Sequence, residues 1–164
     1  MRRTSRIALV SCLAGALLPV AALSTAWSST TSAPTITSVT VTGTASNPVI
    51  TIRGHHFGSR PAHNPTCHPG DGGVCGNYTG YNFGTKLFLV DKSPIAFSAG
   101  RYRPAKSELD SIGLVITTYT QKKIVYHFGS GYHHGHGPDG LKLKNGDHYR
   151  VSVRGAKAGG TVHY

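Results

Sequence analysis

The most constraining feature of the chain is an alternating run close to its C-terminal end. Residues 148–154 alternate polar and apolar side chains, with the apolar ones at Tyr149, Val151 and Val153. Because successive side chains of a β-strand point to opposite faces, this run predicts a strand with one buried and one charged face. Gly159-Gly160 then supplies turn residues. We expect a closing β-hairpin whose last strand, Thr161–Tyr164, finishes at Tyr164.

Similar β-branched or alternating stretches recur along the chain, and glycine (21) and proline (9) fall mostly between them, as expected for the turns of many short strands. The other predicted strands are Pro34–Gly43, Pro48–Gly54, Lys86–Asp91, Ile95–Phe97, Ser111–Tyr119 and Lys122–Phe128. The pattern predicts an all-β, antiparallel β-sandwich of about seven or eight strands. Its predicted inward-facing residues are Ile50, Ile52, Leu114, Ile116, Tyr149, Val151 and Val153.

The N-terminal segment has the pattern of a secretory signal peptide. Three arginines, the last at Arg6, precede the uncharged stretch Ile7–Leu23, and small residues up to Ala26 fit a cleavage point. A membrane anchor is the alternative, but Pro19 interrupts the apolar continuity that a span requires. We therefore expect a signal peptide at 1–26, a flexible linker at 27–33 and a secreted domain at 34–164, without a stable membrane anchor. Cleavage after Ala22 or Ala33 stays open.

The chain is strongly basic, with a formal net charge of +11. Such an excess of positive charge favours contact with anionic partners, such as cell-wall polymers, phospholipid headgroups or nucleic acid. The basic residues are scattered, however, and no helix-turn-helix, zinc-finger or RNP-like sequence accompanies them. We expect a basic surface that keeps a secreted monomer soluble, and no nucleic-acid partner.

After the signal peptide the chain retains two cysteines, Cys67 and Cys75. In an oxidising compartment an even pair eight residues apart predicts one disulfide bond. Zinc ligation, with His63 and His68 nearby, is the alternative, but the spacing is not the short knuckle of structural zinc sites.

The cysteines lie in the longest connection of the chain, residues 55–85, which has little strand character. Connections of this length in compact domains are usually functional or disordered, and a disulfide argues against disorder. Tyr78, Tyr81 and Phe83 alternate with asparagine and glycine there. Rigid aromatic rings bind at a low entropic cost, so we expect these residues to contact a ligand. Tyr132 and the neighbouring histidines are a second candidate surface if their loop folds to the same end of the sandwich.

Both ends of the predicted domain resemble one family. The segment Pro34-Thr-Ile36-Thr-Ser-Val39 is followed by Ile52-Arg-Gly54-His-His-Phe57-Gly58, and a second segment reads Gly146-Asp147-His-Tyr149-Arg-Val151-Ser-Val153. These segments resemble the opening and closing strands of IPT/TIG domains, which are immunoglobulin-like modules. The resemblance implies an immunoglobulin-like sandwich with an adhesion or binding role, and it implies no catalytic group. The 55–85 connection departs from the compact family pattern.

Histidine is abundant, with ten in the chain. His133, His134 and His136 share one glycine-rich loop, and neutral imidazoles suit Zn²⁺, Cu²⁺ or Ni²⁺. A physiological metal site on these three residues is the alternative to adventitious binding, because a glycine-rich loop is not pre-organised.

Catalytic patterns are weak. The chain has six carboxylates, of which only Glu108 and Asp110 lie close together, and no Gly-x-Ser-x-Gly sequence occurs. We therefore expect no enzyme activity and no cofactor. The sequence favours a secreted, monomeric binding or adhesion module whose partner is an extracellular glycan or protein. A small metal-binding protein or a metal-dependent enzyme is the alternative.

Overall fold

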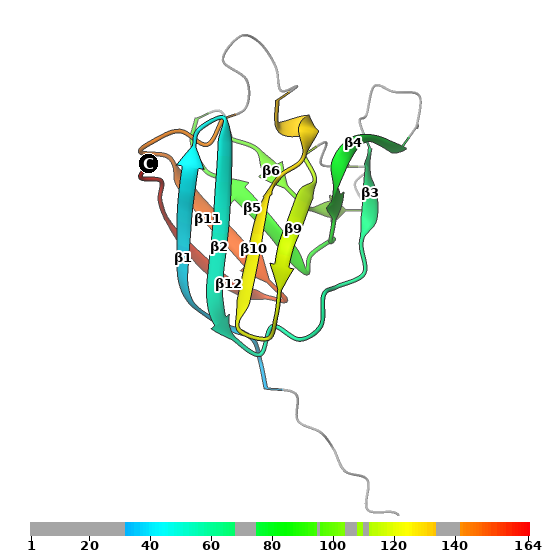
Figure 1. The fold of residues 1–164 in the computed structure, drawn as a ribbon, viewed down its shortest axis with the longest axis vertical. Coiled ribbons are helices and arrows are strands. Elements are labelled where there is room, and N and C mark those ends of the chain that lie inside the picture. The colour runs from blue at the N-terminus through cyan, green and yellow to red at the C-terminus, as the bar shows by residue number, and fades with distance from the viewer. Residues whose placement is uncertain (1–31, 68–74, 95, 104–107, 110–111, 134–141) are drawn as a thin grey trace, which may run out of the picture. The chain divides into compact units, whose positions relative to one another are not determined.

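A computed structural model describes residues 32–67, 75–94, 96–103, 108–109, 112–133 and 142–164 (Figure 1). Residues from Thr31 to Tyr164 form one compact unit. The predicted signal peptide and most of the predicted linker lie outside the described residues. Among the described residues, no helix is long and apolar enough to span a bilayer.

The described elements of the domain are strands, apart from the short 3-10 helix η2 (Ser130–Tyr132). Sheet A has the strand order β1 (Thr35–Thr44), β2 (Asn47–His55), β10 (Lys123–Phe128), β9 (Leu114–Tyr119), β4 (Cys75–Asn82) and β3 (Asn64–Cys67). Sheet B has the order β12 (Ala156–Thr161), β11 (His148–Val153), β5 (Leu87–Asp91) and β6 (Ser98–Ala99). A separate pair consists of β7 (Tyr102–Arg103) and β8 (Glu108–Leu109).

The two large sheets are antiparallel and pack together, with sheet A in front of sheet B in Figure 1. This arrangement confirms the predicted all-β sandwich. Within the described ranges the two sheets contain ten strands, more than the seven or eight expected. The difference arises mainly because the 55–85 connection contributes strands of its own.

The core forms where the apolar faces of both sheets meet. In sheet A, Ile50 of β2 lies opposite Tyr126 of β10, and in sheet B, Val151 of β11 lies opposite Leu89 of β5. All four side chains have no exposed surface. The predicted inward-facing residues are confirmed as buried, with Ile116 partly buried against the same core. Alternation predicted this face correctly because a strand's side chains alternate strictly.

The expectation that residues 55–85 lack strands is wrong. Strands β3 and β4 pair antiparallel in this segment, and β4 joins sheet A where Tyr81 lies opposite Leu114. Irregular register between β3 and β4 explains why alternation did not reveal them. The Oγ1 atom of buried Thr66 donates a hydrogen bond to the Gly80 carbonyl oxygen at 2.8 Å, which helps to hold the two strands together.

The closing hairpin is confirmed, but its predicted turn and last strand are wrong. The chain reverses at Arg154-Gly155, where both residues have positive φ (48° and 96°), and β12 ends at Thr161. Gly160 lies within β12 opposite Tyr149. A Cβ atom there would be only 3.0 Å from the Tyr149 hydroxyl. This glycine therefore accommodates a core tyrosine instead of forming a turn.

Candidate anion-binding site

The structure does not gather the predicted aromatic contacts into one surface. Phe83 and Tyr132 are each only 2% exposed and belong to the core, so the prediction that they contact a ligand is wrong. Tyr78 is partly exposed. Tyr81 is 40% exposed, and its ring meets the His63 ring edge-on at a centroid distance of 4.3 Å. One exposed aromatic ring therefore remains from the predicted set, with a second that is partly covered.

Tyr132 instead connects distant segments. Its hydroxyl donates a hydrogen bond to the Ala45 carbonyl oxygen at 2.7 Å and accepts one from the Leu143 backbone N–H at 2.6 Å. The centroid of its ring lies 4.6 Å from the centroid of the Phe128 ring. Burial raises the pKa of Tyr132 well above its usual value of 10. These contacts fix the β1–β2 turn against the segment that precedes β11.

Two of the three predicted metal ligands lie outside the described residues, whereas the backbone of both predicted disulfide cysteines is described. His133 is exposed, whereas His134 and His136 lie outside the described residues. The described part of the chain contains no group of three or more potential metal ligands. Cys67 lies opposite Cys75 in the β3–β4 pairing. Residues opposite each other in antiparallel strands have Cα atoms about 4.5–5.5 Å apart, a separation that permits a disulfide. The bond stays a prediction.

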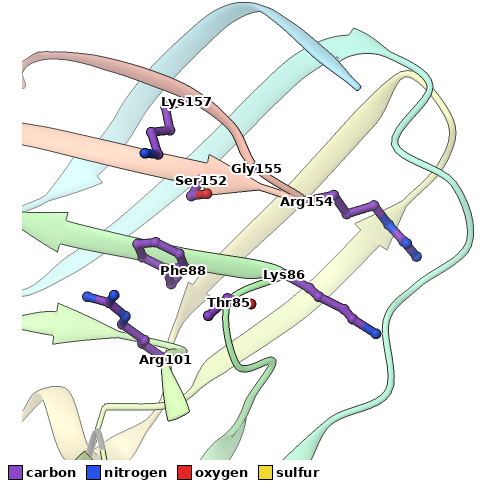
Figure 2. Close-up of a pocket in the computed structure, with 8 residues that line it drawn as sticks. All are labelled: Thr85, Lys86, Phe88, Arg101, Ser152, Arg154, Gly155 and Lys157. Atoms are coloured by element: carbon purple, nitrogen blue, oxygen red, sulfur yellow. The ribbon is translucent and has the colours of Figure 1, made fainter. Parts of the chain in front are cut away.

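A groove of about 510 Å³ lies along sheet B, at the end where β11 turns into β12 (Figure 2). It is lined by Thr85, Lys86, Phe88, Arg101, Ser152, Arg154, Gly155 and Lys157. The strand register brings these residues together. Ser152 of β11 lies opposite Phe88 on one side and Lys157 on the other, and the Arg154 N–H donates to the Lys86 carbonyl oxygen at 2.7 Å. Because their strand neighbours point into the core, Ser152 and Phe88 face away from it.

The groove is positively charged. Four of its lining residues are lysine or arginine, and none of the lining residues that the structure describes is acidic. The acidic residue of β5, Asp91, lies on the core side and is buried. Its carboxylate accepts hydrogen bonds from the Ser93 backbone N–H at 2.9 Å and from the Ser93 hydroxyl at 2.6 Å. Asp91 thus does not neutralise the groove, and clustered charge of one sign attracts ions of the opposite sign.

Two of the four cations are held in place. The Arg101 guanidinium lies over the Phe88 ring, 4.8 Å from its centroid, a cation–π contact. The Arg154 Nη2 atom donates a hydrogen bond to the Ser59 carbonyl oxygen at 2.7 Å. In Figure 2 the Phe88 ring lies between Arg101 and Lys157, whereas Lys86 and Arg154 extend toward the other end of the groove. Positioned cations lose less conformational freedom when an anion binds.

This arrangement is suited to binding carboxylate, sulfate or phosphate groups. Arginine pairs with such groups through two parallel N–H donors, and lysine acts as a point charge. The lining has no histidine or carboxylate that could act as a general base, within the residues described. Sequence reasoning missed the groove because Lys86, Arg101 and Arg154 look scattered along the chain. Strand pairing brings Lys86 and Arg154 together, and Arg101 joins the groove through its contact with Phe88.

No protein-family model matches this chain, and neither a curated protein nor a solved structure matches it. The functional interpretation therefore rests on the groove and on the fold that builds it.

Proposed function

We propose that this protein is a secreted, non-catalytic binding module of the immunoglobulin-like IPT/TIG kind, and that it holds an acidic glycan in the groove of sheet B. The observation that carries the proposal is the convergence of Lys86, Arg101, Arg154 and Lys157 on one groove without an acidic lining residue among those described. The predicted signal peptide supports an extracellular ligand. Acidic polysaccharides are abundant outside cells, and their negative charge is complementary to the positive charge of this groove.

A nucleic-acid ligand fits the groove less well. Proteins that bind single strands use exposed aromatic rings on which bases stack. The one aromatic residue of the lining, Phe88, is 7% exposed, and Arg101 lies over its ring. Duplex readers insert a helix or a β-ribbon into a groove of the nucleic acid. The only helix among the described residues is the single turn η2, whose Tyr132 is buried in the core.

The experiment is a binding titration of the purified protein with polygalacturonate, with neutral dextran as the reference glycan. The test variant combines Lys86→Gln and Lys157→Gln. Its matched control combines Lys122→Gln and Lys123→Gln, which removes the same charge near the β9–β10 turn of sheet A. At about 1 kcal/mol for each cation that meets an anionic surface, the test variant should lose roughly 30-fold in affinity.

The control variant should lose less than about 3-fold, because unspecific long-range charge is largely screened by salt. Equal losses in both variants would show that net charge, not the groove, attracts the ligand. Equal affinity for dextran and polygalacturonate would also reject an acidic-glycan module.

A further inference from the structure

We infer that the ligand of the sheet B groove is an extended polyanion lying along β11, not a single anionic group. This inference rests on the proposed function and names the form of its ligand. It derives from a basic residue, Arg150, which lies outside the groove on the same face of sheet B.

Arg150 continues the cationic surface of the groove. Its strand neighbours Tyr149 and Val151 are buried in the core, so Arg150 faces outward with Ser152. Outward residues of a strand are two positions apart, which is roughly 6.6 Å. Along β11 and its turn, Arg150 is therefore followed by the row of Ser152 and Lys157, and then by the row of Arg154 and Lys86. Each row carries at least one cation over a distance of about 13 Å.

The surface beside Arg150 is open toward β12. The residue opposite Arg150 on that strand is Gly159, which has no side chain, and the residue opposite on β5 is the apolar Val90. The Arg150 Nε atom is buried and has no hydrogen-bond partner in the described structure. The outward positions of β11, β12 and β5 carry no acidic residue in their described parts, since Asp91 points into the core. A ligand chain can thus lie across Gly159 and meet the guanidinium of Arg150.

Chain length is the property that distinguishes this form of binding. A single carboxylate can contact the cations of one row, or of two adjacent rows within the groove. A chain of several acidic sugars contacts successive rows at once, and each further contact is intramolecular once the first has formed. Affinity should therefore rise with chain length until the ligand spans from Arg154 to Arg150. Affinity should also depend more steeply on salt concentration for each additional ligand charge that the protein neutralises.

The test is calorimetric titration of the purified protein with galacturonate monomer, dimer, tetramer and octamer, at about 50 and 200 mM salt. Arg150→Gln is the test variant. Arg53→Gln is its control, because Arg53 is an exposed arginine on a strand of sheet A and the charge change is identical. We expect affinity to rise at least 10-fold from monomer to octamer. Arg150→Gln should weaken octamer binding about 5-fold and leave monomer binding within 2-fold, whereas Arg53→Gln should change neither.

Equal affinity per site for monomer and octamer would overturn the inference, as would equal effects of the two arginine variants on the octamer. Both outcomes leave the proposed acidic-glycan site standing. Failure of every galacturonate to bind would reject the proposed function together with the inference. A single-stranded oligothymidylate of matched charge that binds tighter than the octamer would replace the glycan with nucleic acid and overturn both.

Discussion

Two buried tyrosines should respond differently to replacement with phenylalanine, because Tyr132→Phe should lower stability whereas Tyr126→Phe should not. Tyr126 has no exposed surface, and its hydroxyl has no hydrogen-bond partner within the described structure. Tyr132 is 2% exposed, and its hydroxyl has two partners, the Ala45 carbonyl and the Leu143 N–H. The chemical change is the same in both variants. The difference between their changes in the free energy of unfolding therefore reports how much the two hydrogen bonds of the Tyr132 hydroxyl contribute to stability.

The size of each stability change follows from the hydrogen-bonding groups that lose a partner when the hydroxyl is removed. In Tyr132→Phe, the N–H of Leu143 loses its partner in a fully buried position, and an unsatisfied buried group costs about 1–3 kcal/mol. Ala45 is only half-buried, so the loss of its partner should cost less. We expect Tyr132→Phe to lower the free energy of unfolding by about 2 kcal/mol. Tyr126→Phe removes a buried hydroxyl that has no partner, so we expect no loss of stability or a gain of up to about 1 kcal/mol.

The assay is reversible urea unfolding followed by circular dichroism, with thermal unfolding as a second readout. For a domain of this size, 2 kcal/mol corresponds to a melting temperature lower by about 6–10 °C. The reasoning is refuted if Tyr126→Phe destabilises the protein as much as Tyr132→Phe. If Tyr132→Phe leaves stability unchanged and weakens ligand binding, Tyr132 is a contact residue after all and its assignment to the core connection is wrong.

Three further predictions concern other parts of the domain. Gly129→Ala should destabilise the protein by about 3 kcal/mol or more through overpacking, because the new Cβ would collide with the Thr79 carbonyl oxygen, whereas Gly155→Ala should cost only the roughly 1–2 kcal/mol of a positive φ; urea midpoints of the two variants compare them. Burial raises the pKa of Asp91 above 3.8, so the folded state binds this proton more tightly than the unfolded chain. The free energy of unfolding should therefore fall as pH rises from about 4 through the raised pKa, and Asp91→Asn should flatten that dependence in urea titrations between pH 4 and 7; an identical pH profile in both proteins would contradict it. A Cys67–Cys75 disulfide should contribute roughly 2.5 kcal/mol, and two alkylatable thiols in the non-reduced protein would disprove it.

The fold was predictable where one face of a strand is apolar and packs against the core. Strands β2, β10 and β11 have an apolar core-facing side chain at every second position, and β1 has the same pattern apart from a register shift between Ile36 and Ser38. Strand β4 has little of it. Its sequence contains glycines, and at Gly80 an added Cβ would lie 2.8 Å from the backbone of Gly113. Close backbone approach selected small residues there, and glycine resembles a loop signal when neighbouring strands are unknown.

The candidate site was less predictable than the fold for a related reason. Lys86, Arg101 and Lys157 come from three separate parts of the chain, and each alone resembles an ordinary surface residue. Their proximity depends on the pairing of β5 with β11 and of β11 with β12, and, for Arg101, on the pairing of β6 with β5 and the contact with Phe88. Conversely, Phe83 resembled a contact residue because it lies between Asn82 and Gly84, and Tyr132 because it adjoins the histidine-rich loop. Aromatic residues beside turns also close the end of a core, and local sequence does not separate these two roles.

Binding on the outer face of sheet B is tested most directly by nuclear magnetic resonance of the ¹⁵N-labelled protein during titration with the galacturonate octamer. Amide shifts should concentrate at Phe88, Arg150, Ser152 and Lys157, while those of Tyr81 and His63, near the β3 edge of sheet A, should stay unchanged. Shifts confined to Tyr81 and His63, with the sheet B amides unchanged at saturation, would contradict this prediction.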